Sequence, residues 1–419
     1  MKANSTLAAV LCLAALACTA DTDTKETPTW NGSVGALVAR SCGGCHSEGS
    51  IAPFSSDYAS MRERGALVKQ SVVERTMPPM PVNNDGSCHT YSNARWLSDA
   101  EVDTLVRWVD AGMPLGDGGA AADFSAPVPQ QIENYEVEWV TPEYTPQNGP
   151  TDDYRCFILD SGLTTDDFLV AQQTFPGNSA VVHHVTGFAV SDSDLPWAEA
   201  RDAEDEEPGY SCYGAGAPTS MGITAWAPGS GMIRVPGDAG YRMPASGKVI
   251  VQVHYNLSGG IETDPGTRIR VQARKQVAHE AITLSAADFS LRLAPGEASV
   301  ANNPLHSRSG LAGVTELEPA NWTIYGFYPH MHQMGRTLRA TAKQDGRDQC
   351  AGDVDRWDFN WQDFWEYDQP MKFRKEDGPV LLQLNCTFDT RDVNVETFWG
   401  EDTTDEMCFA AFVATRDDD

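Results

Sequence analysis

Five of the nine histidines lie in three short apolar segments that have the pattern of β-strands. Imidazole is a good ligand for copper, zinc, iron and nickel, so several histidines in such strands indicate metal binding more strongly than a single one does. We therefore predict metal binding here, although the spacing alone does not name the metal. The segments are 180–185, 249–255 and 328–332, and the histidines are His183, His184, His254, His330 and His332.

The positions of these histidines within each strand predict which side chains meet. His330 and His332 are two residues apart, so they face the same side of a strand and can bind one ion. His183 and His184 are adjacent and would normally point to opposite faces. Binding one ion through both of them therefore requires a strand end or a β-bulge.

A second group of residues has the spacing for covalent haem. Cys42, Cys45 and His46 form a C-x-x-C-H motif, which is the attachment motif of c-type haem. The two thiols reach the haem vinyl groups, and the adjacent histidine supplies the proximal iron ligand. A zinc knuckle and a redox-active C-x-x-C pair are the alternatives. The neighbouring histidine and the export signal described below favour one covalent haem.

The sixth iron ligand is expected near the loop of residues 76–81, whose sequence is Thr-Met-Pro-Pro-Met-Pro. We predict Met77, which directly precedes two prolines, and keep Met80 and His89 as the alternatives. A thioether ligand raises the reduction potential of a haem relative to a second histidine. The choice among these three residues therefore bears on the potential of the haem.

Two helices are expected to form the haem segment. Residues 34–45 suit a short helix that leads into the motif. A second helix is predicted to begin at Ser98, because Ser98 and Glu101 form a capping box, and to end at Gly112. The segment resembles a small class I cytochrome c, and we assign residues 31–115 to such a domain. Apolar residues at helical spacing support the second helix, namely Val102, Leu105, Val106 and Val109.

Residues 1–17 have the pattern of a secretory signal. A charged start is followed by an apolar run over residues 7–17, which is shorter than the roughly 20 residues that cross a bilayer. Small residues precede Cys18, as in a bacterial lipoprotein cleavage site, and an ordinary signal peptidase site nearby is the alternative. We expect an exported, periplasmic or cell-envelope protein with a lipid anchor at Cys18 and a tether over residues 18–30.

The overall composition excludes some partners and indicates several domains. The chain has 419 residues, which predicts about three domains. It carries 59 acidic and 30 basic side chains and a formal net charge of -29. Nucleic acid and anionic lipid bind to basic protein surfaces, so neither is an expected partner. Small residues between 116 and 134 predict a flexible linker. From residue 135 onward, short alternating apolar runs broken by Gly, Pro, Asn and Asp predict a mainly β region.

Four short motifs occur in order along this β region. They are His183-His184, Gln252-Val253-His254-Tyr255, His330-x-His332-x-x-Gly335 and Asp405-Glu406-Met407-Cys408. Together they resemble the copper type II, ascorbate-dependent monooxygenases, which include peptidylglycine α-hydroxylating monooxygenase and dopamine β-monooxygenase. The likeness covers roughly residues 140 to 419, and residues 225–229 also resemble a segment that the family carries between its first two metal motifs.

The resemblance implies two nine-stranded, jelly-roll-like β-sandwiches. With the haem segment before them, the expected fold is mainly β, with a small α-helical cytochrome c domain at its start. The first sandwich would span residues 135–283 and the second residues 284–419, each with one copper. The electron-storing copper of the first sandwich would be bound by His183, His184 and His254. The catalytic copper of the second sandwich would be bound by His330, His332 and Met407. A soft thioether beside two imidazoles favours Cu(I), the form that reacts with dioxygen.

Six cysteines lie outside the signal and haem segments, and in an exported protein they favour disulfides. The resemblance implies a bridge between Cys386 and Cys408, behind the methionine ligand. The sequence does not decide how the other four cysteines pair. These four are Cys88, Cys156, Cys212 and Cys350.

Two positions depart from the peptide-hydroxylating members of the family. Those enzymes clamp the substrate carboxylate with an arginine two residues before the first histidine of the H-x-H motif, where this chain has Tyr328. They also use a tyrosine four residues after the methionine ligand, where this chain has Ala411. A peptide that ends in glycine is therefore not the expected substrate.

We expect an exported copper monooxygenase that hydroxylates a C–H bond of a small-molecule or peptide-like substrate with dioxygen. The fused haem would supply or relay the electrons that an external donor provides. The main alternative is a non-catalytic periplasmic haem and copper protein for electron transfer or copper binding. A further alternative is an oxidase that releases peroxide. The sequence leaves the substrate, the donor and the oligomeric state open.

Overall fold

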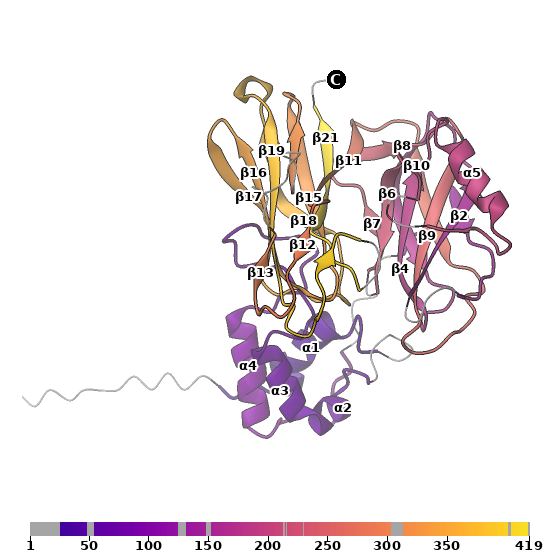
Figure 1. The fold of residues 1–419 in the computed structure, drawn as a ribbon. Helices are drawn as coiled ribbons and strands as arrows, with labels where there is room; N and C mark the ends of the chain where they lie inside the picture. The colour runs from indigo at the N-terminus through magenta and orange to yellow at the C-terminus, as the bar shows by residue number, and fades with distance from the viewer. Residues whose placement is uncertain are drawn as a thin grey trace, which may run out of the picture.

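The computed structural model describes residues 26–47, 54–124, 131–147, 152–212, 214, 216–228, 230–302, 313–400 and 404–417. Within these ranges a helical N-terminal module precedes a region of strands, so the predicted mainly β class is confirmed (Figure 1). No helix among the described residues has the length and apolar character needed to cross a bilayer. The predicted signal at residues 1–17 and the predicted anchor at Cys18 lie outside the described residues.

The helical module has its own buried core. Its elements are η1 (Trp30–Val34), α1 (Gly35–Cys42), α2 (Tyr58–Glu63), α3 (Gly65–Val73) and α4 (Asp99–Asp110). The rings of Trp30 and Trp108 lie at the centre of the core, 5.8 Å apart. The hydroxyl of Ser98 accepts a hydrogen bond from the N–H of Glu101, and the N–H of Ser98 donates to the Glu101 carboxylate. Gly112 follows with a φ of 81°, so the predicted second helix and both of its ends are confirmed.

The first sandwich consists of two sheets that share one core. Its strands are β1 (Val137–Val140), β2 (Asp152–Asp160), β3 (Phe168–Phe175), β4 (Val182–Ala189), β5 (Tyr210–Ser211), β6 (Met221–Trp226), β7 (Ile233–Arg234), β8 (Ala239–Arg242), β9 (Lys248–Asn256) and β10 (Arg268–Arg274). One sheet has the order β5-β2-β9-β4-β6, and the other contains β1, β10, β3, β8 and β7. Val251 of β9 and Ile269 of β10 lie in the same core, and helix α5 (Leu195–Glu204) packs beside β2 and β5.

The second sandwich is built in the same way. Its elements are β11 (His279–Ala287), β12 (Arg292–Leu293), β13 (Val300–Ala301), β14 (Val314–Leu317), β15 (Trp322–His330), β16 (Gly335–Gln344), β17 (Arg347–Val354), β18 (Trp365–Phe373), η2 (Lys375–Asp377), β19 (Val380–Phe388), β20 (Thr397–Phe398) and β21 (Phe409–Arg416). One sheet has the order β13-β19-β16-β17 with β14 on β19, and the other has the order β11-β21-β15-β18. Leu384 of β19 and Phe412 of β21 share its core.

One sheet runs through both sandwiches. His279 and Glu280 of β11 pair in parallel with Ala239 and Gly240 of β8, which joins the two halves into a nine-stranded sheet. β11 spans the boundary predicted at residue 283 and pairs over most of its length with β21. Backbone hydrogen bonds therefore join the two sandwiches, which lie side by side in Figure 1.

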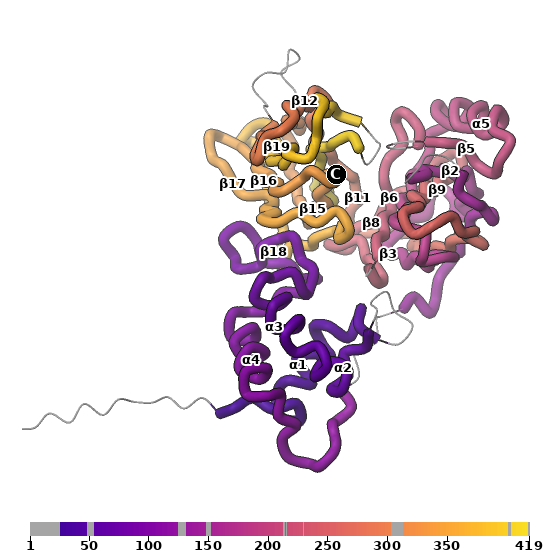
Figure 2. Tube along the Cα trace, turned by 60° about the horizontal axis from the view of Figure 1, so that its bottom comes forward, coloured from indigo at the N-terminus to yellow at the C-terminus, as the bar shows by residue number. Residues whose placement is uncertain are grey.

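An extended segment of the N-terminal region, residues 80–96, packs on the second sandwich, and we call it the arm. Val82 pairs with Val354 of β17, and Tyr91 pairs with Tyr367 of β18. These two strands lie at the ends of the two sheets, so the arm bridges the open side of the sandwich. The tube in Figure 2 shows the arm between the helices and β18.

The arm is part of the core of the second sandwich, although the sequence places it within the haem domain. Met80, Val82 and Tyr91 are buried together with the core residues of that sandwich. A disulfide joins Cys88 of the arm to Cys350 of β17. The second sandwich therefore takes part of its core from a segment that precedes the first sandwich in the chain.

The first part of the predicted linker, residues 117–122, lies against the helical module. The side chain of Asn31 donates to the carbonyl groups of Asp117 and Ala120, at 2.7 and 2.9 Å, and accepts from the N–H of Ala122 at 2.8 Å. These bonds hold residues 117–122 in place, whereas their composition predicted a flexible segment. Residues 125–130 lie outside the described residues.

Candidate metal centres

The first candidate centre lies where β4 and β9 run side by side. Val182 pairs with Tyr255 and His184 pairs with His254, so His183 is the extra residue of a β-bulge. A bulge locally re-aims side chains, and this is the distortion that two adjacent histidine ligands require. Of the two arrangements that the sequence left open, a strand end or a bulge, the structure has a bulge, and the three histidines of the first centre lie together there.

The three imidazoles of the first centre converge through their Nδ1 atoms. The Nδ1 atoms of His183, His184 and His254 lie 3.3 Å from one another. A point equidistant from the three atoms is about 1.9 Å from each, close to the roughly 2.0–2.1 Å of a metal–imidazole bond. Three nitrogen lone pairs that face one another repel unless a cation lies between them. The arrangement therefore fits a bound metal ion.

The surroundings keep these histidines in the neutral form that binds metal. Burial lowers the pKa of His183 to about 3 and the pKa of His184 well below its usual value. His254 donates from Nε2 to the Asp152 carboxylate at 2.7 Å, and its ring stacks on Tyr154 at a centroid distance of 4.0 Å. A carboxylate behind a ligating histidine fixes the tautomer and the ring orientation, so Asp152 directs Nδ1 of His254 to the centre.

The second candidate centre lies at the end of β15 and on the turn that follows. The ring centroids of His330 and His332 are 5.2 Å apart, in agreement with the predicted common face. Nδ1 of His330 lies 2.6 Å from Oε1 of Gln362, and Nδ1 of His332 lies 3.2 Å from the carbonyl oxygen of Asp405. Nε2 is therefore the candidate ligand atom of both rings. Burial lowers the pKa of His330 to about 4, which favours the neutral ligand form.

Met407 lies on the segment that precedes β21, next to the strand that carries His330. His330 pairs with Phe409 in the antiparallel register of β15 and β21. Continuing this register by two residues sets Met407 opposite His332. Met407 is buried, and two imidazoles with one thioether form a donor set that suits copper.

Glu406 joins the turn after β15 to the segment that carries Met407. Its carboxylate accepts hydrogen bonds from the backbone N–H groups of His332, Met334 and Met407, at 3.1, 2.9 and 3.0 Å. Glu406 is fully buried, and burial raises its pKa to about 7. This one carboxylate therefore positions two candidate ligands through their backbones.

Three disulfides form among the described residues. The bridge between Cys386 and Cys408 is present as the resemblance implied, and it holds the strand segment beside Met407. The pairing of the other four cysteines, which the sequence left open, is Cys88 with Cys350 and Cys156 with Cys212. The predicted disulfide-bonded character of the chain is confirmed.

The second sandwich matches a known family. Residues 313–413 match the C-terminal domain of the copper type II ascorbate-dependent monooxygenases. Tyramine beta-hydroxylase of Caenorhabditis briggsae is 28% identical over 245 residues, which are 56% of this chain and 39% of that protein. Putative DBH-like monooxygenase protein 2 of Homo sapiens is 26% identical over 297 residues, 67% of this chain and 56% of that protein.

These similarities support a copper-dependent monooxygenase. DBH-like monooxygenase protein 2 of Mus musculus is 24% identical over 249 residues, 56% of this chain and 38% of that protein. The chain thus spans about half or less of the length of the relatives that it matches. Among solved structures, the infectious bursal disease virus VP2 subviral particle aligns with a TM-score of 0.20 and 8% identity over 70% of this chain and 75% of that chain, which is too low to indicate a shared fold.

The two departures from the peptide-hydroxylating monooxygenases lie opposite each other. Tyr328 of β15 pairs with Ala411 of β21. The Tyr328 hydroxyl donates to Oε1 of Gln362 at 3.5 Å, so this position offers a neutral phenol in place of a cation. Met331, between the two histidines of the second centre, is fully buried in the core of the second sandwich.

The predicted haem residues lie at the end of α1. Cys42 and Cys45 are free thiols. Nδ1 of His46 lies 3.2 Å from the carbonyl oxygen of Phe54, and the two rings are 4.4 Å apart. A backbone carbonyl on one ring nitrogen is the usual setting of a ligating histidine, so Nε2 is the candidate iron ligand. Cys42, Cys45 and His46 are the residues that a covalent haem would use.

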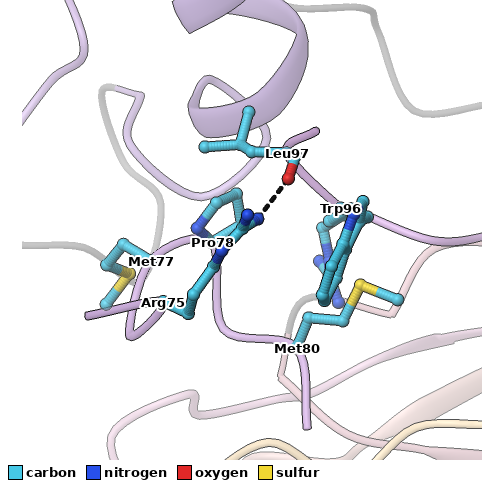
Figure 3. Close-up of a pocket in the computed structure, with 7 residues that line it drawn as sticks. Arg75, Met77, Pro78, Met80, Trp96 and Leu97 are labelled. Atoms are coloured by element: carbon cyan, nitrogen blue, oxygen red, sulfur yellow. Dashed lines mark hydrogen bonds between the residues drawn. The ribbon is translucent and has the colours of Figure 1, made fainter. Parts of the chain in front are cut away.

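The three candidate sixth ligands lie in different surroundings. Met77 is 37% exposed on the loop after α3. Met80 is buried against the second sandwich, and Figure 3 shows it beside Trp96, on the other side of Pro78 from Met77. His89 stacks on Tyr367 at 4.0 Å, and its Nε2 lies 2.8 Å from the carbonyl oxygen of Cys350. Met80 and His89 are engaged with the second sandwich, and Met77 stays the predicted ligand.

Three residues that contact the candidate ligands were not predicted from the sequence. Asp152 lies 102 residues before His254, so no local pattern connects them. Gln362 lies on an irregular loop between β17 and β18, where no periodicity marks it. Glu406 stood inside a recognised motif, and an acidic residue directly before a buried ligand was the available signal.

Proposed function

We propose that this chain is a copper monooxygenase that hydroxylates a C–H bond of a still unidentified substrate, with dioxygen and electrons from an external donor. The carrying observation is the convergence of the three Nδ1 atoms at the first centre, in a chain whose residues 313–413 match the monooxygenase domain. Bound copper would supply one-electron chemistry with dioxygen.

The residues of the chain have distinct tasks in this proposal. Asp152 holds the tautomer of His254, and Gln362 holds the ring of His330. Met407 supplies a soft donor, which favours the reduced metal at the second centre. Tyr328 presents a neutral hydroxyl where peptide-hydroxylating relatives bind a carboxylate, so we propose a substrate without a carboxylate at that position.

A copper titration with oxygen uptake tests this function. We expect two copper ions per chain and dioxygen consumption when ascorbate is added. Met407→Leu should keep the first copper but lower oxygen uptake by about a hundredfold, since the metal is tuned by its ligands. Met334→Leu is the matched control, because Met334 lies on the adjoining turn. His254→Ala should leave about one ion per chain.

The same titration separates the alternative functions. Two bound ions without oxygen uptake would favour a non-catalytic electron-transfer or copper-binding protein. Uptake that releases one peroxide per dioxygen, whatever substrate is added, would favour an oxidase. A chain that binds no copper would overturn the proposal.

We further propose that the helical module carries one covalent c-type haem on Cys42 and Cys45, with His46 and Met77 as axial ligands. The free thiols and the carbonyl of Phe54 on His46 support this. Haem at this position would supply or relay single electrons to the copper centres. Acid–acetone extraction should leave the haem on the chain, and Met77→Ala should abolish the spectrum of methionine ligation. An unchanged spectrum would exclude Met77.

Export with a lipid anchor is also proposed. Three disulfides support maturation in an oxidising compartment outside the cytoplasm. The signal at residues 1–17 would be removed and Cys18 acylated. Mass spectrometry of the mature N-terminus tests this, and Cys18→Ser should move the protein from the membrane fraction to the soluble fraction. A mature chain that begins elsewhere without lipid would contradict the anchor.

A further inference from the structure

The loop between β17 and β18, residues 357–364, touches both candidate centres, and we call it the inter-site loop. On the side of the second centre, Nε1 of Trp357 donates to the carbonyl oxygen of His332 at 2.9 Å. Oε1 of Gln362 lies 2.6 Å from Nδ1 of His330. The loop therefore holds both histidines of the second centre.

Phe359 is the residue of the inter-site loop that contacts the first centre. Its ring stacks on His183, with centroids 5.2 Å apart and an interplanar angle of 23°. The same ring meets His332 edge-on, with centroids 6.3 Å apart and an angle of 85°. Because both imidazoles lie against one phenyl ring, their centroids are at most about 11.5 Å apart. A single side chain thus contacts a ligand of each centre.

The conformation of the inter-site loop is held from within. The side-chain amide of Gln362 donates to the carbonyl oxygen of Phe359 at 2.9 Å, while its oxygen faces His330. The N–H of Asn360 donates to the Asp358 carboxylate at 3.0 Å. Gln362 therefore couples the backbone at Phe359 to the ring of His330.

The arm and the first sandwich hold the far end of the same loop. Nδ2 of Asn93 donates to the carbonyl oxygen of Phe364 at 2.5 Å, and the N–H of Glu366 donates to Oδ1 of Asn93 at 3.2 Å. Asp363 pairs with Arg95 of the arm at 3.4 Å and accepts from Ser230 of the first sandwich at 3.4 Å. Three parts of the chain meet at this loop.

We propose that Phe359 is a positioning residue that sets the separation of the two centres, and that the arm holds it in place through Asn93. A packed phenyl ring between the imidazoles keeps the two sandwiches at one distance and excludes water from the space it fills. The ring also fixes the distance that an electron crosses between the two centres, a consequence that rests on the proposed function. Loss of the ring removes the contact that spans the two centres.

A distance measurement on the copper-loaded protein tests this placement. Pulsed EPR on the chain with both coppers oxidised should give one narrow copper–copper distance. Phe359→Ala should broaden or lengthen it, and Phe359→Tyr, which keeps the ring, should restore it. Phe289→Ala is the matched control, since Phe289 lies on the second sandwich, 74% exposed, against Trp399. An unchanged distance in Phe359→Ala would overturn the inference and leave the proposed function intact.

Turnover and the arm give a second readout. Ascorbate-driven oxygen uptake should fall by about tenfold or more in Phe359→Ala, as expected when reacting groups are misplaced. Asn93→Ala should broaden the distance in the same direction, whereas Asn360→Ala, on the exposed part of the loop, should not. A narrow distance in Asn93→Ala would remove the arm from the inference.

Hydrogen exchange on the copper-free chain keeps the inference testable if copper does not bind. The backbone of β4 around His183 should exchange faster in Phe359→Ala than in the unchanged chain, although the substitution is on the other sandwich. Phe289→Ala should leave this exchange unaltered. Equal protection of β4 in all three chains would overturn the placement of Phe359, whatever the function of the protein.

Discussion

Asp152 touches His254 on the side away from the other two imidazoles, and the pair is almost fully buried. Replacing it by Asn keeps an oxygen that accepts the Nε2 proton but removes the negative charge. We expect Asp152→Asn to lower the copper affinity of the first centre by about tenfold to a hundredfold, the usual cost of a lost contact behind a metal ligand. Competition with a chelator of known affinity measures this.

The control for this change lies on the same strand. Asp160 is at the other end of β2, is exposed and pairs with Lys248. Asp160→Asn should leave the copper affinity unchanged. Equal affinities in the two variants would show that Asp152 has no influence on the metal.

Glu406, like Asp152, acts by holding candidate metal ligands in position. A carboxamide has one acceptor oxygen and one donor group, so Glu406→Gln leaves backbone N–H groups of the turn without an acceptor. We expect the free energy of unfolding to fall by about 1–3 kcal/mol, and copper to leave the second centre before the first. Urea unfolding and copper analysis measure the two effects. Glu318→Gln, at an exposed ion pair with Arg416, is the control, and equal losses in both variants would contradict the role of Glu406.

At this scale the sequence predicted the candidate ligands but not what holds them. The spacing of His330 and His332 predicted a common face. Adjacency at His183 and His184 required a strand end or a bulge, and a bulge is present. Asp152 could not be predicted, because its contact with a histidine 102 residues away depends on how strands pair across the sheet.

Among the elements, the arm has a titratable contact of its own. Burial lowers the pKa of His89 below its usual value of 6.5, although the Cys350 carbonyl opposes this shift. Below that value His89 takes up a proton in the unfolded chain but not in the folded chain. Its contribution to the free energy of unfolding is therefore fully present above about pH 6.5 and is lost as the pH falls further. His89→Phe keeps an aromatic ring on Tyr367 and removes this loss.

Denaturant midpoints measured from about pH 8 down to about pH 5.5 test this sign. The midpoint of the unchanged chain should fall more over this range than the midpoint of His89→Phe. A steeper fall in the variant, or parallel curves, would contradict the assignment of the pH dependence to His89.

The elements differ in how far the sequence predicted them. α4 carries its own signals, a capping box at Ser98 and a glycine after its last turn, and both ends were predicted. The arm has no periodic pattern, because its pairing consists of isolated bridges at Val82 and Tyr91 and its apolar residues pack on strands far along the chain. Only the folded second sandwich defines it.

On the scale of the whole molecule, the sheet that passes from β8 to β11 and the arm both tie parts of the chain together. We therefore expect one cooperative thermal transition for the two sandwiches. Copper at a hundred times its dissociation constant should stabilise the folded chain by about 2.7 kcal/mol per site, and the shift should move the whole transition. Calorimetry with and without copper measures this shift. Two separate transitions, of which copper moves only one, would contradict cooperative unfolding of the two sandwiches.

The bridge between Cys88 and Cys350 encloses the bridge between Cys156 and Cys212. A newly made chain emerges with its N-terminus first, so Cys88 meets Cys156 and Cys212 before Cys350 exists. Oxidation in order of emergence would join Cys88 to Cys156 and fasten the arm to the wrong sandwich. We therefore predict that maturation needs a catalyst that reshuffles disulfides, and that a host without one accumulates chains in which Cys88 is not joined to Cys350.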